Sequence, residues 1–534
     1  MNFKNVYKKM LVMGCMILLG GSTLAGCGTK EVSKTETKTD TKTNTTTNSS
    51  QPSDQKQEVV EDNTPYKLSI MAAGANDETD VQETRQRIYQ DIREYTNTDV
   101  EFIFYDDTMY KEKLPLVLAS GDLPSIMVVD KTPDIANAIS NDVFWEVGPY
   151  LDNYENLKYI HPVALENASY NGKLYSVPRA RSVGRNGVGY RLDWLENLGM
   201  KEPKAIDEFY KMLVAFTYND PDGNGKDDTF GMAVTSYQGP WDSMQIWFGV
   251  PNEWGEDESG NLIPAHMTNE YDEALNFFRK IYSEGLVNQD FANYDASKWD
   301  EMLRGGQAGC AVDVVDRFRR NQNYFVKEGI PAKTLIVGGF EGEDGLKLLP
   351  TPGFMGMFVF SKDKIKDETE LQKALYFMDK MSDAEMVNLI EWGYKDEFYY
   401  TDEQGVSIRY TAEEKPEAQL NAHKALNQIT SYIVSPENEA KRLKGAAPDA
   451  IKQLELDVQI ENEKYVVNNP AASYVSQTMV DFGTELDAII DTARIQYITG
   501  EIDEIGLKEA KERWLKSGGQ KVIEEMNAIH QANK

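Results

Sequence analysis

Cysteine and histidine are scarce in this chain of 534 residues, which has three cysteines and four histidines, the latter at positions 161, 266, 423 and 530. The histidines do not recur at the spacing of metal ligands, and no HExxH, GxSxG, GxGxxG, GxxxxGK[ST] or CxxC motif is present. These absences argue against the common zinc, serine and nucleotide chemistries, and we expect no enzyme activity. Carboxylates are so abundant that the sequence leaves a glycosidase pair open.

Positive charge and long apolar runs are also lacking. Lysine and arginine number 56 against 87 aspartates and glutamates, which gives a formal charge of −31. Such acidity argues against nucleic acid and anionic surfaces as partners. No segment after the N-terminal region has the uninterrupted apolar length of a membrane span.

The N-terminus has the order of a secretory signal: lysines at 4, 8 and 9, a short apolar run over 10–20, and then small residues. We assign 1–26 to this signal. The last residues, Leu24-Ala25-Gly26-Cys27, resemble the bacterial lipobox. That resemblance implies that Cys27 receives lipid (palmitate among its chains), becomes the mature N-terminus and anchors the chain on the extracytoplasmic face of the cell membrane.

The segment 27–65 is rich in Thr, Ser, Lys and Asn and has little to bury, which predicts a disordered tether. A flexible coil of this length has an r.m.s. span of ~35 Å. Because Cys15 is lost with the signal and Cys27 is lipidated, Cys310 is left alone. We expect it to be a small buried hydrophobe.

The first part of the body alternates between strand and helix patterns. Strands are predicted over 66–72, 100–105 and 126–129, with helices over 81–95 and 110–119 between them. This alternation predicts an α/β fold with a parallel sheet. Ligands of such sheets bind at the carboxyl ends of the strands, which places Asp130 and Lys131 near a site. Later residues favour long helices, including 454–466, 479–496 and 507–528, with strands at 334–337 and 355–360.

Three segments resemble the family-1 extracellular solute-binding lipoproteins of ABC sugar importers, in the subgroup with large oligosaccharide-binding lobes. They are Ser120–Pro124, then Asn171–Pro178 leading into Tyr190–Gly199, and finally the stretch from Lys201 to Lys226. The resemblance implies a helix-rich, type II periplasmic-binding-protein-like fold, with two lobes joined by a hinge. It also implies an oligosaccharide ligand in an interlobe cleft, ABC permease subunits as partners, and a monomer attached to the membrane only through its lipid.

We place the first lobe at 66–185 with 332–400, and the second at 186–331 with 401–534. The glycine-rich segment Ser182–Gly187 is the candidate for the first crossing between them. Two alternatives to transport stay open: a secreted polysaccharide hydrolase or lyase, and a sensory sugar-binding subunit.

A calcium-loop pattern lies between positions 220 and 228. Asp220, Asp222, Asn224 and Asp228 occupy loop positions 1, 3, 5 and 9, and Lys226 offers its backbone carbonyl at position 7. Glycine stands at position 6, where a tight turn is needed. Position 12, which is glutamate in an EF-hand, is a glycine here. The pattern therefore predicts an EF-like site for structural Ca²⁺, and the resemblance points the same way.

Aromatic and basic side chains supply the ligand-binding candidates. Indole faces stack on the apolar C–H faces of sugars, so Trp241, Trp247 and Trp254 are the leading candidates, with Trp299, Trp392 and Tyr190 behind them. Arg179 and Arg181, with Arg185 and Arg191, form a basic stretch in an acidic chain. Two hypotheses fit this stretch: recognition of an acidic sugar such as a uronate, or salt bridging at the hinge.

Overall fold

The computed structural model describes residues 64–74, 82–416, 420 and 424–534, all within the compact unit that starts at residue 63. The predicted signal, Cys27 and the tether lie outside these residues. In the described parts no helix combines the length and apolarity needed to cross a membrane. The described strands are β1 Tyr66–Ala73, β2 Thr98–Tyr105, β3 Ile126–Val129, β4 Ser176–Ala180, β5 Asn186–Arg191, β6 Phe230–Met232, β7 Trp254–Glu256, β8 Leu262–Pro264, β9 Ala308–Val314, β10 Thr334–Val337, β11 Phe354–Phe360, β12 Tyr399–Thr401 and β13 Ser407–Arg409.

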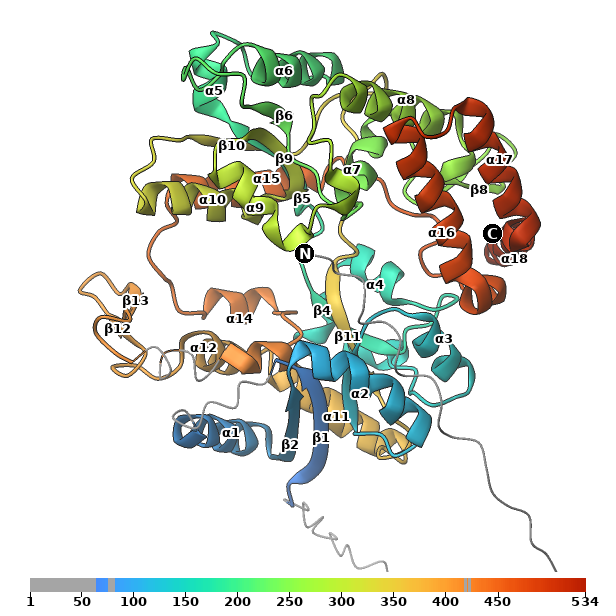
Figure 1. Ribbon diagram of the computed structural model, residues 1–534. Helices are drawn as coiled ribbons and strands as arrows, with labels where there is room; N and C mark the ends of the chain where they lie inside the picture. The colour runs from blue at the N-terminus through green and yellow to red at the C-terminus, as the bar shows by residue number, and fades with distance from the viewer. Residues whose placement is uncertain (1–63, 75–81, 417–419, 421–423) are drawn as a thin grey trace, which may run out of the picture. The chain divides into compact units, whose positions relative to one another are not determined.

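The helices of the described residues outnumber these strands (Figure 1). They are α1 Gln82–Thr96, α2 Asp107–Ser120, α3 Pro133–Ser140, α4 Pro162–Ala168, α5 Leu192–Asn197, α6 Ile206–Tyr218, α7 Gly239–Trp247, α8 Asn269–Ser283, α9 Trp299–Arg304, α10 Val315–Lys327, α11 Glu368–Lys380, α12 Ala384–Trp392, α14 Pro436–Ala440, α15 Ala450–Asn462, α16 Gln477–Thr499, α17 Glu504–Trp514 and α18 Gln520–Asn533.

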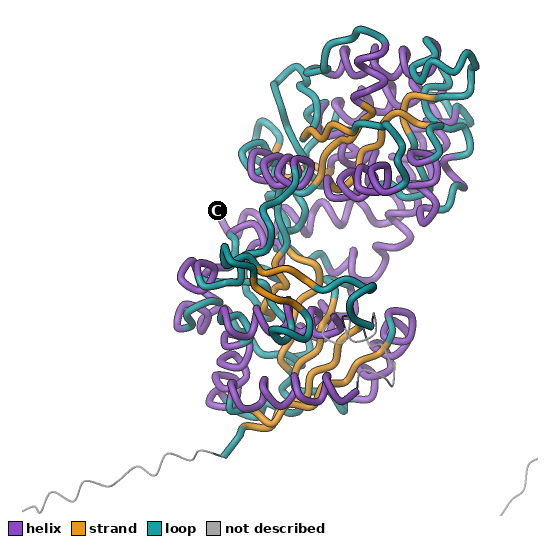
Figure 2. Tube along the Cα trace, turned by 90° about the vertical axis from the view of Figure 1, so that its left-hand side faces the viewer, coloured by secondary structure: helices purple, strands orange, loops and turns teal. Residues whose placement is uncertain are grey.

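Two sheets organise the chain, and helices flank the strands of each (Figure 2). The first sheet has the order β2-β1-β3-β11-β4, and the second has the order β10-β5-β9-β6. In the first sheet β1 runs parallel to β2 and β3, as predicted, whereas β11 is antiparallel to both of its neighbours. The sheet is therefore mixed, because β11 enters it from a distant part of the chain rather than through a helical crossover.

Each sheet carries its own hydrophobic core. The first core joins β1, β2 and β3 to β11 and α11, and the second joins β5, α6, α7, α8 and β9. We call these cores, with their sheets, the first and second lobes. Residues 181–185 connect β4 of the first lobe to β5 of the second, in the segment expected to make the first crossing.

Two segments differ from the expected lobe boundaries. Strand β10 falls in the 332–400 segment assigned to the first lobe, yet it hydrogen-bonds to β5 in the second sheet. Leu426, Ile429 and Ile433 fall in the 401–534 segment assigned to the second lobe, yet they pack in the first core. In both cases tertiary pairing decides the lobe, and the local sequence pattern does not encode that pairing.

The C-terminal helix expected over 507–528 is interrupted. Helix α17 ends at Trp514, a short π-helical turn follows, and α18 begins at Gln520. Gly518 has φ of 140° within this turn, a conformation that glycine adopts without steric cost. Cys310 is fully buried in the second core, and burial raises the pKa of its thiol, so it is the small hydrophobe that was predicted.

Helix α10 lies close against β5, where Gly189 leaves room for the ring of buried Phe318. A Cβ atom at position 189 would stand 2.1 Å from the Cγ atom of Phe318. We expect Gly189→Ala to lower the free energy of unfolding by roughly 1–3 kcal/mol, because the overpacked ring must shift. Urea denaturation followed by circular dichroism measures this change. Gly483→Ala in α16 is the control, because the nearest atom there is the flexible Met479 Cε at 3.3 Å, and it should not destabilise the chain.

Candidate functional site

A cavity of about 1130 Å³ is lined by residues from distant parts of the chain. Asp130, Lys131 and Asn167 come from the first lobe, and residues 238–271 come from the second. The segment 349–356, which links the second sheet to β11, forms another wall. The C-terminal region closes the cavity with the segment 469–476 and helix α16. A pocket of this size has room for a small organic ligand of several rings.

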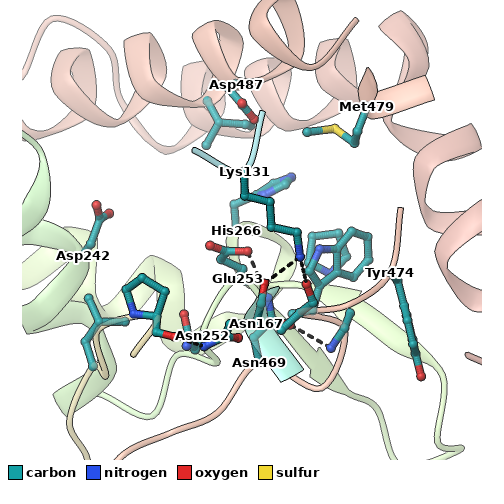
Figure 3. A pocket seen from close by; sticks show the side chains of 18 of the residues that line it. Lys131, Asn167, Asp242, Asn252, Glu253, His266, Asn469, Tyr474, Met479 and Asp487 are labelled. Atoms are coloured by element: carbon teal, nitrogen blue, oxygen red, sulfur yellow. Dashed lines mark hydrogen bonds between the residues drawn. The ribbon is translucent and has the colours of Figure 1, made fainter. Parts of the chain in front are cut away.

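Lys131 is the best-anchored charged group of the cavity (Figure 3). It follows β3, and its Nζ donates to the carbonyl oxygens of Asn167 (2.9 Å), Ser169 (3.0 Å) and Ala472 (2.6 Å). The first two carbonyls end helix α4, where backbone acceptors have no partner within the helix. Burial lowers the pKa of Lys131 to about 8, while Glu253 and Glu166 act against this shift. Lys131 is therefore mainly cationic at neutral pH, with its protons already shared.

Glu253 lines the cavity with an exposed side chain, and its carboxylate lies next to Asn469 in Figure 3. Its backbone φ is 59°, in the left-handed region that non-glycine residues seldom adopt. The side chain accepts a hydrogen bond of 2.9 Å from Asn469 Nδ2. Its surroundings raise the pKa of Glu253, first through burial and then through the charges of Asp242 and Asp487, although Lys131 opposes them. The carboxylates of Asp242 and Asp487 therefore repel that of Glu253 across the cavity.

Arg494 of α16 sits behind two further acids. Its Nη1 donates to Asp242 (2.6 Å) and its Nη2 to Asp491 (3.2 Å). The guanidinium is buried, and its Nε has no hydrogen-bond partner among the described residues. Asp487, one turn before Asp491, is exposed to the cavity, and burial followed by the charge of Asp491 raises its pKa. This wall of the cavity therefore exposes carboxylates to the ligand space, and the guanidinium of Arg494 lies buried behind them.

Aromatic side chains form the wall near the C-terminal helices. Trp254 and Trp514 both line the cavity and belong to the same small apolar cluster. His266 meets the ring of Trp514 edge to face at 4.4 Å. Burial, followed by the charge of Lys511, lowers the pKa of His266 to about 3, so that its imidazole is neutral at physiological pH. Apolar ring faces beside carboxylates and amides suit a ligand with both C–H faces and hydroxyl groups.

The structure brings two of the predicted ligand-binding residues to the cavity, Asp130 and Trp254. Four others are not accessible for stacking on a ligand, which corrects the prediction. Their rings lie inside cores with at most 2% of their surface exposed: Tyr190, Trp241, Trp247 and Trp299. Trp392 lies elsewhere, in a small cluster with Phe398 and Tyr399 and under the guanidinium of Arg409.

Helix α7 shows why the tryptophan pattern was misleading. Trp241 and Trp247 face the second core, whereas Gln238, Asp242 and Gln245 around the same helix line the cavity. Helix α7 therefore reaches the cavity through its polar side chains, whereas its tryptophans pack in the core. The spacing of 238, 242 and 245 is the helical spacing that could have indicated a polar face.

The four arginines are engaged within the protein. Arg179 is buried and donates to the carbonyl oxygens of Met355 and Asn427, and exposed Arg181 contacts the sulfur of Met355. Arg185 pairs with Asp316, and Arg191 pairs with Asp193. None of the four is a lining residue of the cavity. Salt bridging therefore accounts for Arg185 and Arg191, whereas Arg179 and Arg181 contact backbone carbonyls and a sulfur atom.

The segment 220–228 forms a tight loop between α6 and β6. Asp220 Oδ1 and Oδ2 accept hydrogen bonds from the backbone N–H groups of Asn224 and Gly225. The Asn224 Nδ2 atom lies 2.8 Å from Asp222 Oδ2 and 3.1 Å from Asp228 Oδ1, so it stands where these acids would share a cation. No group of three or more His, Cys, Asp or Glu side chains in the described parts of the chain is arranged to hold a metal ion. The oxygen-only donor set nevertheless fits Ca²⁺ chemistry.

Sequence reasoning missed most of the polar residues of the cavity: Asn252, Glu253, His266, Asn469, Asp487, Asp491 and Arg494. Glu253 immediately precedes Trp254, a predicted ligand-binding residue, and this position in the sequence could have indicated that it lines the site. The residues of α16 reach the cavity only through tertiary packing, because this helix contacts both α3 and α8.

The family model for the bacterial extracellular solute-binding proteins matches residues 75–315. The chain is 39% identical over 451 residues to Lipoprotein LipO of Bacillus subtilis (strain 168), which covers 83% of this chain and 88% of that protein. The chain belongs to the bacterial extracellular solute-binding proteins. The chain is also similar to the Polygalacturonan/rhamnogalacturonan-binding protein YtcQ of the same organism, at 30% identity over 98% of both chains.

The fold of this solute-binding protein also matches solved structures. The Streptococcus pneumoniae substrate-binding protein FusA in complex with kestose aligns with a TM-score of 0.61 at 20% identity, over 88% of this chain and all of that one. FusA has also been solved as an EF-hand mutant. The resemblance to this family and the helix-rich, two-lobed α/β fold are thereby confirmed.

The buried imidazole predicts a pH dependence of stability. With a folded pKa of about 3 against an ordinary value of 6.5, His266 binds fewer protons in the folded state than in the unfolded state between these values. Stability due to this group is therefore fully present above pH 6.5 and is lost as the pH falls, by about 1.4 kcal/mol per pH unit. Urea denaturation gives the free energy of unfolding at each pH between 6 and 4. In His266→Gln its dependence on pH should be less steep than in the wild type by this amount. His161→Asn, at an exposed helix N-terminus, is the control and should keep the wild-type slope.

Proposed function

We propose that this solute-binding protein captures an oligosaccharide in the cavity and delivers it to an ABC importer. The observation that carries the proposal is the lining itself: Trp254 offers a partly exposed ring in the same cavity as the carboxylates of Glu253, Asp242 and Asp487. Sugars present apolar C–H faces and hydroxyl groups, and this combination binds both. YtcQ is named for binding polygalacturonan and rhamnogalacturonan, and FusA for fructooligosaccharides, which supports a carbohydrate ligand.

Capture is proposed to occur without chemistry. The chain would act as a monomer held outside the cell membrane by lipid on Cys27, with permease subunits as its partner. The likeness to LipO, named a lipoprotein, supports the anchor. Closure of the two lobes around the sugar would be the signal read by the permease. A secreted hydrolase or lyase is the competing function, because carboxylates line the cavity.

The loop at 220–228 is proposed to bind Ca²⁺ in a structural role. Asp220, Asp222, Asn224 and Asp228 would supply side-chain oxygens, and Lys226 would supply its backbone carbonyl. The EF-hand mutant of FusA supports such a site in a related protein. Bound Ca²⁺ would neutralise acids of the loop that joins α6 to β6.

Binding and turnover distinguish the two functions in one experiment. Purified chain is incubated with a panel of oligosaccharides, and both the melting temperature and the products are measured. We expect stabilisation of about 2.7 kcal/mol at a hundredfold excess over Kd, with no shorter sugars released. Trp254→Ala should weaken binding roughly three- to tenfold and Trp254→Phe much less, because the ring face is kept. Release of shorter sugars would replace the binding function with hydrolysis.

Removal of calcium tests the loop. We expect EDTA to lower the melting temperature of the wild type and added Ca²⁺ to restore it, because a ligand that binds only the folded state stabilises it. The double variant Asp222→Ala and Asp228→Ala should melt at the lower temperature with or without EDTA. The variant Asp257→Ala, which changes an exposed aspartate of the β7–β8 turn, is the control and should respond to EDTA as the wild type does. A wild type that does not respond to EDTA would contradict an occupied site.

A further inference from the structure

The charges of the cavity are unbalanced. Its described lining residues include five carboxylates: Asp130, Asp242, Glu253, Asp487 and Asp491. Two cationic side chains, Lys131 and Arg494, stand against them. His266 adds no positive charge at physiological pH, because its pKa is lowered to about 3 by burial. Even with Arg179 counted, which lies outside the lining but near Asp130, acids remain in excess.

Both cations are already engaged. Three carbonyl oxygens lie within hydrogen-bonding distance of the Lys131 ammonium, so each of its protons has an acceptor. Arg494 donates to Asp242 and Asp491 and keeps only 7% of its side-chain surface exposed. A ligand carboxylate that came to either group would have to displace a partner already in place. Neither cation is therefore available as the paired donor that a uronate requires.

Three amide donors of the lining are engaged as well. Asn167 Nδ2 donates to the carbonyl of Pro352, Asn252 Nδ2 to that of Val467, and Asn469 Nδ2 to Glu253.

Acceptors, in contrast, are open. The Glu253 carboxylate lines the cavity and accepts one hydrogen bond in the described structure, from Asn469. Among the described residues no group donates a hydrogen bond to Asp487. Its carboxylate faces the cavity (Figure 3). The cavity therefore needs a ligand that supplies hydrogen-bond donors.

From this arrangement, and resting on the proposed function, we propose that the cavity selects a non-acidic oligosaccharide and excludes uronates. Sugar hydroxyls, or the ammonium of an amino sugar, would donate to the carboxylates of Glu253 and Asp487. A uronate would instead add like charge to an acidic wall, which costs several kcal/mol in protein recognition. The selectivity would thus differ from that of YtcQ, which is named for polygalacturonan and rhamnogalacturonan, although the two chains are 30% identical.

Charge can be varied on a single sugar backbone. Oligogalacturonates and their fully methyl-esterified forms of equal length differ in charge at the carboxyl groups and nowhere else in the chain of sugars. Neutral galacto-oligosaccharides and chitosan oligomers complete the panel. Isothermal titration calorimetry with the full-length chain, purified in detergent, gives the affinity for each. We expect the bound sugars to be neutral or amino sugars, and the ester to bind at least about tenfold more tightly than the acid, with the difference shrinking at high salt.

The variant Asp487→Asn should narrow the difference between ester and acid, because it removes one carboxylate of the wall. Asp481→Asn is the matched control: it lies on the same helix, is exposed outside the cavity, and pairs with Gln477. It should leave the difference unchanged.

Three results would overturn the proposal. Acid bound more tightly than its ester would reverse the selectivity while leaving oligosaccharide capture intact. If Asp487→Asn leaves the difference in affinity between ester and acid unchanged, the carboxylates of the cavity wall are not its cause. Binding of none of these sugars would overturn oligosaccharide capture itself, and this inference with it.

Discussion

The ammonium of Lys131 holds together parts of the chain that are far apart in sequence. It extends from the end of β3 to the last carbonyls of α4 and to the carbonyl of Ala472, more than 300 residues away. The segment around Ala472 is fixed again nearby, because the N–H of Asn171 donates to Ser473 and its side chain accepts from Val475. This segment leads directly into α16. The position of the acidic wall therefore depends on contacts made at the far side of the cavity.

The same contacts explain why the polar groups of the cavity are committed to internal partners. A buried ammonium is tolerated only when its protons are accepted, and a buried carbonyl only when a donor reaches it. Lys131 satisfies both requirements at once. The nearby carboxylate of Glu253 supports the cation, whereas burial works against its charge. Lys131 thus stabilises the packing of the fold, and the hydrogen-bond acceptors around it remain to bind the ligand.

Local patterns in the sequence predicted what local physics determines. Strands β1, β2 and β3 follow the alternation and apolar runs that a half-buried or buried strand needs. The burial of Cys310 followed from its chemistry and its isolation. The resemblance supplied the two-lobed arrangement, and Asp130 and Lys131 were found at the carboxyl end of β3 as the sheet geometry predicts.

The remaining features depend on tertiary packing that no local pattern encodes. The polar residues at 238, 242 and 245 have a helical spacing and the tryptophans of α7, six residues apart, do not, but only the packing of α8 decides which side of the helix is buried. Strand β10 reads like any short strand, and its partner β5 lies more than 140 residues away. The acids of α16 are unremarkable in an acidic chain until the Lys131 anchor brings their helix to the cavity.

Glu253 connects the stability of the fold to its use. A non-glycine residue in the left-handed region costs on the order of 1 kcal/mol or more, and a carboxylate near Asp242 and Asp487 adds repulsion. Glutamine at this position would remove the repulsion, and glycine would remove the strain. A residue that carries both costs in the wall of a cavity is better explained by what it binds than by what it stabilises. Because the carboxylate accepts one hydrogen bond in the described structure, from the Asn469 amide, it keeps lone pairs for a ligand that donates.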